Sequence, residues 1–216
     1  AAQFHSTVAV DRQDRVWVAW DEDSENWGKD FSRSSAVPGS RGLHFSRTLG
    51  VRVWSGSKVQ SPSADLRKIL TGRMERYAEL PHLALDGGGA LWMVFRHWTL
   101  TQPHEIYHFY ATRLAAEGWT TPVRLAESSG QNTQHAGLAT GADGGLRVVY
   151  SSDGRSPTNL PKDQAHALHY NVFAASLAKA DPAALVLTPL TVTPPASVFS
   201  PRRRATQGRY TLLLGD

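Results

Sequence analysis

Three segments of the chain repeat one apolar pattern in a single register, and this repetition limits the fold more than any other feature. Val-Trp-Val-Ala-Trp at 16–20 and Leu-Trp-Met-Val-Phe at 91–95 each follow an aspartate at the same interval. Leu-Arg-Val-Val-Tyr at 146–150 keeps the register with an arginine in place of the tryptophan. Short apolar runs separated by glycine and proline are typical of strands and turns. Three such units indicate a repeated all-β architecture.

Each unit is followed by two further expected strands, which brings the total to four per unit. These strands are expected at 43–48 and 51–54, at 106–114 and 119–125, and at 167–177 and 185–192. Four antiparallel strands repeated at about blade length favour a β-propeller. We therefore predict an all-β chain, a partial β-propeller of three four-stranded antiparallel blades, with Trp17, Trp92 and Arg147 at equivalent positions.

The same pattern predicts the domain organisation. The blades are expected at about 1–60, 76–125 and 134–192, within a propeller segment of residues 1–192. Prolines and an arginine triplet predict a linker over 193–209, and residues 210–216 have the pattern of the first strand of a following domain. The chain begins within a strand pattern, so we expect it to belong to a larger protein.

Three blades are fewer than the roughly four that close the smallest propellers. The expected partners are therefore the remaining blades and the C-terminal domain of the parent protein, or another copy of the chain. Open sheet edges and an uncovered core face promote association. We expect this segment alone to be poorly soluble or to self-associate.

The connections between strands predict where a ligand would bind. In an antiparallel blade, the turns after the first and third strands lie on one face, and the loops after the second and fourth strands lie on the other. The first set is short, whereas the second is long and chemically varied, at 21–42, 55–79, 96–105, 126–134 and 151–166. Binding residues usually lie on such loops over a rigid scaffold. Residues 64–70 add the pattern of a short helix within one of these loops.

The candidate ligand-binding residues all fall in loops expected on this long-loop face. They are Asp21, Asp23, Asn26, Trp27, Asp30, Arg96, His97, Asp153 and Arg155. Two guanidinium groups converging on a channel would suit a carboxylate or phosphate. An aromatic ring among polar residues suits stacking on a sugar. Carbohydrate or an acidic small molecule is therefore the expected class of ligand, and no catalytic residue is assigned.

The two arginines also have a structural interpretation, which we favour. Arg96 and Arg155 would pair with acids and hold blades together, because partly buried charges need partners whatever the function. The candidate acids for this pairing are Asp21, Asp153 and Glu79.

The other candidate features have alternatives as well. Trp27 is equally suited to holding its own long loop in place. The acids at 21–30 could supply oxygen ligands to Ca²⁺, but a solvated loop is the favoured interpretation. No histidine pair has helical ligand spacing with a third ligand nearby, so no metal site or cofactor is expected within this chain.

Composition excludes several classes of partner. Four arginines but only one acid follow residue 199, so most of the net charge of +4 lies in the tail and the rest of the chain is nearly neutral. A basic nucleic-acid groove is therefore not expected. No apolar run approaches the ~20 residues of a membrane helix. The absence of cysteine excludes disulfides and thiolate metal sites.

Residues 17–22, 26–30, 40–44 and 208–216 resemble the region leading into an uncharacterised bacterial family, itself similar to metallohydrolases of the polymerase-and-histidinol-phosphatase type. Members carry a propeller-like segment and then a domain opening with Gly-Asp-Leu-His-x-His, of which only Gly215 and Asp216 are present here. The resemblance implies a periplasmic or secreted location and places any divalent metal in the following domain. Residues 117–122 resemble, more loosely, the end of a repeat in sialidase-type propellers.

Together these observations predict an accessory, ligand-binding or scaffolding propeller segment of a larger bacterial hydrolase-like protein, without a complete catalytic site. The alternative is a glycosidase-like or sialidase-like enzyme that acts on acidic carbohydrate at the long-loop face. In that alternative, Asp21, Asp23 or Asp153 would act as acid or base, while Arg96 and Arg155 would orient the sugar.

Overall fold

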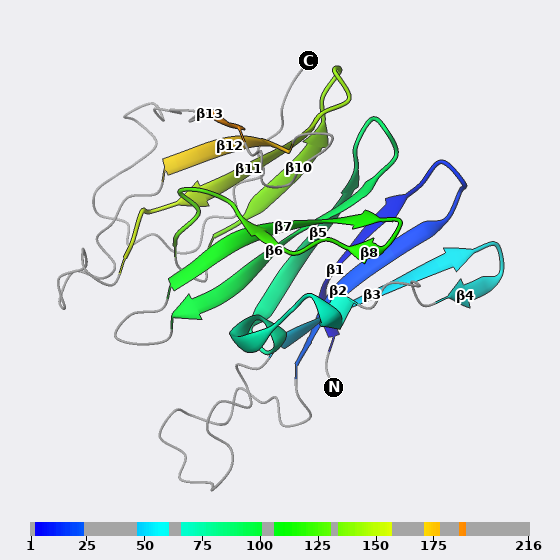
Figure 1. The fold of residues 1–216 in the computed structure, drawn as a ribbon, viewed down its shortest axis with the longest axis horizontal. Coiled ribbons are helices and arrows are strands. Elements are labelled where there is room, and N and C mark those ends of the chain that lie inside the picture. Colours follow the sequence, from blue (N-terminus) through cyan, green and yellow to red (C-terminus); the bar gives the residue numbers. More distant parts are fainter. Residues whose placement is uncertain are drawn as a thin grey trace, which may run out of the picture.

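The computed structural model describes residues 3–23, 47–60, 66–100, 106–130, 134–156, 171–177 and 186–188. Within these ranges the chain forms three antiparallel sheets and no α-helix (Figure 1). The first sheet has the order β1 (Gln3–Val10), β2 (Val16–Asp23), β3 (Arg47–Ser55) and β4 (Lys58–Gln60). The all-β, partial propeller-like fold predicted from the sequence is confirmed.

The second and third sheets follow the same meander. The second contains β5 (Ala78–Leu85), β6 (Leu91–Leu100), β7 (Ile106–Ala115) and β8 (Gly118–Trp119), with β9 (Val123–Arg124) also paired to β7. The third contains β10 (Ala136–Thr140), β11 (Leu146–Ser152), β12 (Asn171–Leu177) and β13 (Val186–Thr188). The linker and the following strand expected at 193–216 lie outside the described residues.

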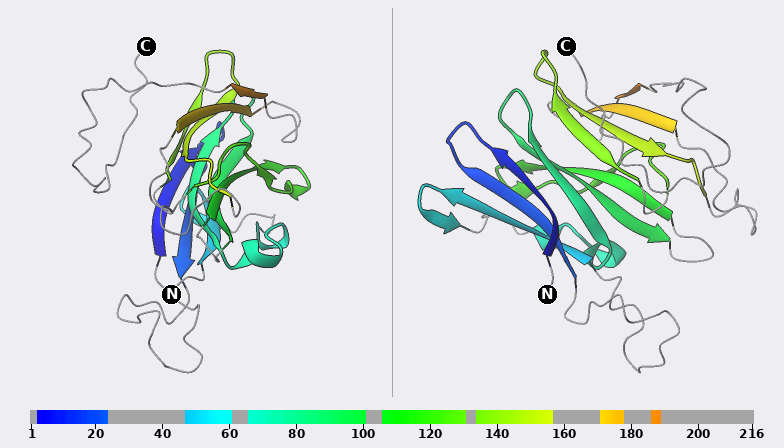
Figure 2. Two further views of the ribbon diagram at one scale, coloured as in Figure 1. Left: turned by 90° about the vertical axis from the view of Figure 1, so that its left-hand side faces the viewer. Right: turned by 180° about the vertical axis from the view of Figure 1, so that it is seen from behind.

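The three sheets lie face to face in a row, with the second between the other two (Figure 2). Side chains of β2 and β6 form one core, which includes Trp17, Met93 and Phe95. The opposite face of β6 packs on β11 in a second core, which includes Trp92 and Val148. Because β6 is buried on both faces, its sequence is a continuous apolar run rather than an alternating one.

The three hairpins keep the register inferred from the sequence. Trp17 pairs with Ala9, Trp92 with Ala84, and Arg147 with Ala139. Trp17, Trp92 and Arg147 therefore occupy equivalent positions, as predicted. The three hairpin turns point the same way (Figure 1), so the ends of β2, β6 and β11 gather at the opposite end of the sheets.

The repeated aspartate before each tryptophan closes a hairpin turn. Asp86 Oδ1 accepts hydrogen bonds from the backbone N–H of Gly88 (2.9 Å) and Ala90 (3.0 Å), and its Oδ2 accepts one from Trp92 Nε1 (3.0 Å). Asp11 makes the equivalent contacts in the first hairpin, including one with Trp17 Nε1 at 2.8 Å. Burial opposes ionisation, but these hydrogen bonds outweigh it and lower the pKa of both carboxyl groups.

The first sheet departs from the predicted strand boundaries. A single strand, β3, runs through Gly50, where the sequence suggested a break between two strands. Gly50 lies opposite Trp20, and a Cβ there would come within 2.5 Å of the indole ring. This glycine therefore makes room for a cross-strand ring, and the turn is instead at Gly56, which has φ +60°.

Other boundaries differ as well. The strand expected at 119–125 is divided into β8 and β9, which both pair with β7, so the second sheet has five strands. The helix expected at 64–70 is a 3₁₀ turn at Leu66–Lys68, followed by another at Gly72–Glu75. Within the described ranges, no helix is long and apolar enough to cross a membrane.

Candidate functional site

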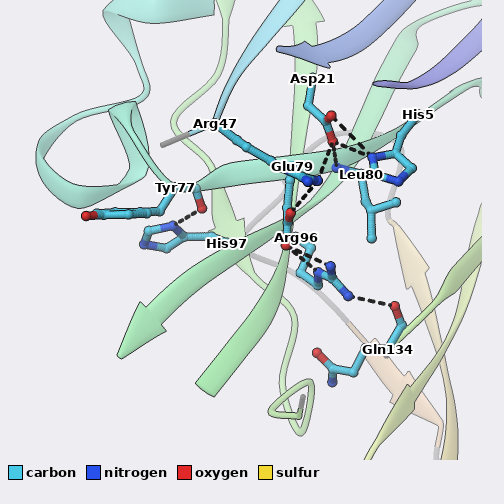
Figure 3. A network of polar contacts seen from close by, with 9 residues as sticks. All are labelled: His5, Asp21, Arg47, Tyr77, Glu79, Leu80, Arg96, His97 and Gln134. Atoms are coloured by element: carbon cyan, nitrogen blue, oxygen red, sulfur yellow. Dashed lines mark hydrogen bonds and ion pairs between the residues drawn. The ribbon is translucent and has the colours of Figure 1, made fainter. Parts of the chain in front are cut away.

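A network of polar side chains, most of them buried and His5 exposed at its edge, connects the three sheets at the long-loop end (Figure 3). We call it the central polar network and define it as His5, Asp21, Arg47, Glu79, Arg96 and Gln134. These residues come from β1, β2, β3, β5, β6 and the segment just before β10. The network brings two of the predicted site residues, Asp21 and Arg96, together with their partners.

Asp21 is the residue of the first sheet that contacts the second sheet directly through its carboxylate. Its side chain is 0% exposed. One carboxylate oxygen lies 2.9 Å from His5 Nδ1 and accepts a hydrogen bond of 2.7 Å from the backbone N–H of Leu80 on the second sheet. Arg47 Nη1 lies 3.9 Å from the same oxygen. Asp21 therefore joins two sheets rather than facing an open channel.

Two β-bulges produce this arrangement. The pairing of β1 with β2 shifts between Phe4 and Thr7, and the pairing of β5 with β6 shifts between Glu79 and His82. Within these bulges, His5 has φ +47° and Leu80 has φ +51°, a left-handed conformation that is uncommon for non-glycine residues. Bulges redirect groups out of the ladder, and here the N–H of Leu80 is directed to Asp21.

Glu79 is held by two arginines. Its Oε1 accepts hydrogen bonds from Arg96 Nε (3.0 Å) and Nη2 (2.7 Å), and its Oε2 accepts one from Arg47 Nη1 at 2.9 Å. Arg96 is 4% exposed. Its Nη1 donates to the backbone oxygen of Gln134 at 3.1 Å, and its guanidinium lies 4.7 Å from the centre of the Tyr107 ring. Arg96 thus connects the second sheet to the third.

The charges in this network balance one another. The two carboxylates of Asp21 and Glu79 lie among the two guanidinium groups of Arg47 and Arg96. A buried ion pair is weak evidence for stability by itself, but removing one partner leaves an uncompensated buried charge. The arrangement suits a structural connection between sheets, and neither carboxylate is placed as an unengaged acid or base.

Arg155 forms a second buried pair beyond the end of β11. Its Nε donates to both carboxylate oxygens of Asp153, at 3.0 and 2.9 Å, and both residues are buried. The backbone N–H of Asp153 donates to the carbonyl of Ser129 at 3.1 Å. The favoured interpretation is confirmed as far as pairing with acids goes, for Arg96 with Glu79 and for Arg155 with Asp153. Each acid belongs to the same sheet or segment as its arginine, so these ion pairs do not themselves join two blades.

His97 is separated from Arg96 because adjacent strand residues point to opposite faces. The two side chains leave β6 on opposite sides (Figure 3). The imidazole Nδ1 lies 2.8 Å from the Tyr77 carbonyl, to which it donates. Burial lowers the pKa of His97. His97 therefore does not share a site with Arg96.

The structure corrects the placement of four predicted loop residues. Asp21 and Asp23 lie within β2, which ends at Asp23, and Arg96 and His97 lie within β6, which extends to Leu100. Both strands continue because their ends pair with β3 and β7. Asn26, Trp27, Asp30 and the side chain of Asp23 lie outside the described residues, so their place at the long-loop face stays a prediction.

Three members of the network were missed by the sequence analysis: His5, Arg47 and Gln134. Arg47 pairs in register with Asp23, so opposite charges on neighbouring strands would have indicated it, had the start of β3 been recognised. His5 and Gln134 have no comparable signal, because His5 itself lies in a bulge and Gln134 meets Arg96 of another sheet. In the described ranges, no group of three or more His, Asp or Glu side chains is placed to hold a metal ion.

No protein-family model matches the chain, and no curated protein sequence matches it. Solved structures with a similar arrangement include a fucose lectin from Kordia zhangzhouensis in complex with methyl-fucoside, at 11% identity and a TM-score of 0.44, over 87% of this chain and 99% of the lectin. An endo-arabinase from Bacteroides thetaiotaomicron VPI-5482 has 16% identity and a TM-score of 0.46, over 90% of this chain and 63% of the arabinase.

A third similar structure is the polysaccharide lyase Uly1, with 12% identity and a TM-score of 0.41, over 82% of this chain and 40% of the lyase. The chain therefore spans less than two thirds of the arabinase and of the lyase. At these identities and TM-scores, the structural similarity does not indicate a ligand or an activity for this chain. The resemblance to the metallohydrolase family receives no support from these comparisons.

Proposed function

We propose that the chain is an accessory scaffold segment of a larger protein, in which the stacked sheets hold the loops of the long-loop face in place. The observation that carries this proposal is the set of contacts between sheets: Asp21 with the N–H of Leu80, Glu79 with Arg47, and Arg96 with the backbone oxygen of Gln134. These three side chains, of Asp21, Glu79 and Arg96, are engaged by other parts of the protein and hold the ends of the strands in position. Contact with a ligand would therefore be made by residues of the loops. The bacterial, periplasmic or secreted parent, its hydrolase-like character and its C-terminal domain rest on the sequence resemblance alone.

Ligand contact at this face is proposed for Asn26, Trp27 and Asp30. An indole ring beside amide and carboxylate groups suits a carbohydrate, because the ring stacks on the apolar face of a sugar while polar groups bond its hydroxyls. The glycosidase alternative requires two carboxyl groups about 5–10 Å apart that are available to the substrate. The contacts of Asp21 and Asp153 give that alternative no support.

The proposal is tested by comparing Trp27→Ala with Arg96→Gln. Binding of a panel of sugars that includes glucuronic acid is measured by calorimetry, and thermal unfolding is followed by circular dichroism. We expect Trp27→Ala to weaken sugar binding with an unchanged Tm, and Arg96→Gln to lower the Tm because it leaves Glu79 without its closest partner. An Arg96→Gln variant that keeps its Tm but loses glucuronic acid binding would overturn the structural role of the arginine.

A further inference from the structure

His97 and His108 lie directly opposite each other on β6 and β7. Such cross-strand partners project from the same face of a sheet, with about 4.5–5.5 Å between their Cβ atoms. This face also carries Met93 and Phe95, so it is opposite to the face of Arg96. The two imidazoles therefore form a pair outside the central polar network, and we call them the histidine pair.

Hydrogen bonds determine which nitrogen of each ring carries the proton. The Nδ1 of His97 donates to the carbonyl of Tyr77 at 2.8 Å. The hydroxyl proton of Thr99 is donated to the carbonyl of Ile106 at 3.1 Å, so the Nδ1 of His108, 2.8 Å from that hydroxyl oxygen, donates to it. Both rings therefore present an unprotonated Nε2, which is a hydrogen-bond acceptor.

Both Nε2 atoms are placed to accept hydrogen bonds from a ligand. In the described part of the chain neither has a hydrogen-bond partner, and neither is sealed from solvent. Burial lowers the pKa of both rings, that of His108 to about 4. The histidine pair is therefore uncharged at neutral pH and offers two acceptors side by side.

Arg73 lies at one end of the histidine pair. Its guanidinium is 4.6 Å from the centre of the Tyr77 ring, and its Nη2 donates to the carbonyl of Trp98 at 3.5 Å. Tyr77 is also the residue whose carbonyl holds His97. Arg73 is exposed and forms no ion pair with an acid of the described ranges. Its guanidinium is thus held beside the pair and keeps N–H groups for a ligand.

Arg124 lies at the other end. It is opposite Tyr110 in the pairing of β7 with β9, so its side chain is on the same face as the histidine pair. The Tyr110 ring is 5.7 Å from the ring of His97. After burial, the charge of Arg124 is the next cause of the low pKa of His108, which places these two groups close together. Arg124 is exposed and, among the residues described, has no acid as partner.

This arrangement favours one class of ligand. Two imidazole Nε2 atoms could bind a transition metal ion, but two guanidinium groups beside them oppose a cation. A simple anion would be attracted by the arginines, but its oxygens would also face the imidazole lone pairs. A sugar acid satisfies both sets of groups, because its carboxylate accepts hydrogen bonds from a guanidinium and its hydroxyls donate to the imidazoles.

We propose that the histidine pair and the two arginines beside it, Arg73 and Arg124, form a binding site for an acidic sugar such as a uronic acid. The imidazoles accept hydrogen bonds from neighbouring hydroxyls of the sugar ring, and an arginine binds its carboxylate. The site is built from β6, β7, β9 and the second 3₁₀ turn, so it does not depend on what adjoins the two outer sheets. It is also separate from the ligand contact proposed for Trp27.

The first test observes the two histidines directly. NMR of protein with isotope-labelled histidine should show the Nδ1-protonated tautomer for both rings at neutral pH, and His97→Phe and His108→Phe assign the signals. Addition of sodium glucuronate should shift both Nε2 signals. Rings protonated at Nε2, or signals that do not move at saturating glucuronate, would overturn the proposal.

The second test measures glucuronate binding by calorimetry. Arg124→Gln should weaken it about two- to fivefold, as expected for the loss of an exposed ion pair, and should leave the binding of glucose unchanged because glucose has no carboxylate. Lys58→Gln is the matched control, because it also removes one exposed positive charge, from β4. It should bind like the unmodified chain. Equal losses in the two variants would show a general effect of charge and contradict the site.

His108→Phe keeps a ring at this position but removes the acceptor. It should weaken the binding of glucuronate and glucose alike, by about two- to tenfold for one lost hydrogen bond, and circular dichroism establishes that the variant is folded. A folded His108→Phe variant with unchanged affinity would overturn the role of the pair.

Trp27→Ala separates this site from the long-loop face. Glucuronate should still shift the histidine signals in Trp27→Ala, whether or not Trp27 contributes a contact of its own. If Trp27→Ala removed all binding, the sugar would belong to the long loops and the histidine site would be wrong.

Zinc and inorganic phosphate decide between the classes of ligand. Neither should compete with glucuronate for the site. An equimolar amount of Zn²⁺ that shifts both Nε2 signals would assign the histidine pair to a metal ion. Phosphate that binds more tightly than glucuronate would assign the arginines to a simple anion, and either result would overturn the proposal.

Discussion

At the residue scale, Asp86 joins a turn to a core. Its carboxylate accepts hydrogen bonds from two turn amides and from the indole of Trp92, which is 0% exposed. In the third hairpin, Asp143 has a related role, since it accepts bonds from the N–H of Gly145 and from Arg147 Nη2. Asp143 is exposed, because the arginine that replaces the tryptophan faces outward.

Replacing Asp86 with alanine should therefore destabilise the protein strongly. The change removes three hydrogen bonds and leaves a buried indole N–H without a partner, which costs about 2–4 kcal/mol of unfolding free energy. Asp143→Ala, the matched control in an exposed turn, should have a clearly smaller effect. Urea unfolding of the two variants measures the difference, and equal losses would contradict the role given to Trp92.

His82 predicts a pH dependence of stability. Burial, followed by the charges of His135, His5 and Arg96, lowers its pKa from 6.5 to about 4. The unfolded chain therefore binds more protons than the folded one between these two pH values, and stability falls as the pH is lowered from 6.5 towards 4. Above pH 6.5 this contribution is fully present.

The size of the effect is about 3 kcal/mol for His82 across that window. Unfolding free energies measured from pH 7.5 down to pH 4.5 should therefore decline, and His82→Gln should flatten part of the decline. A slope that is the same with and without His82 would show that other groups cause it.

At the element scale, the hairpin turns contact one another across the sheets. Arg12 of the first hairpin donates to the carbonyl of Gly87 in the second, and the N–H of Gly87 donates to the carbonyl of Gly144 in the third at 2.8 Å. A Cβ on Gly87 would lie 2.4 Å from the Cα of Gly144. The close approach of two backbones requires glycine here, at an ordinary φ.

Gly87→Ala should accordingly push the second and third hairpins apart and cost about 1–3 kcal/mol of unfolding free energy, as overpacking does. Gly137→Ala, in β10, is the control, because a Cβ there meets nothing within 4 Å. It should be neutral or slightly stabilising, since alanine loses less backbone entropy than glycine. Thermal unfolding compares the two, and a neutral Gly87→Ala would argue against direct contact between the hairpins.

At the scale of the whole molecule, stability should be greatest in the middle sheet. Residues 92–95 of β6 are all 0% exposed and lie between two cores. By contrast, β4 is an edge strand whose three residues are exposed. Local opening follows burial and contact density, so amide hydrogens of β6 should exchange last and those of β4 among the first.

Hydrogen exchange measured by mass spectrometry tests this order. The two outer sheets should lose protection before the middle one as denaturant is added. If β6 exchanged as quickly as β4, the two cores would not be sharing the middle sheet in solution.

The repeat was readable from the sequence because its signals are local. Alternation along each strand and the constant interval from Asp11 to Trp17 and from Asp86 to Trp92 depend only on near neighbours, and they predicted the register and the all-β fold correctly. Strand ends were less predictable. Gly50 carried a turn signal, yet it lies within β3 because Trp20 on the neighbouring strand needs its space.

The chemistry of the site was decided by tertiary structure. The sequence determined that acids and arginines lie near the ends of the second strands, and the pairing of Arg96 with Glu79 was among the interpretations it allowed. It contained no sign that Asp21 would bond the N–H of Leu80, 59 positions away, or that His5 would join it. Such contacts arise only when bulges on different sheets are packed together, because the partners are adjacent in space and remote along the chain.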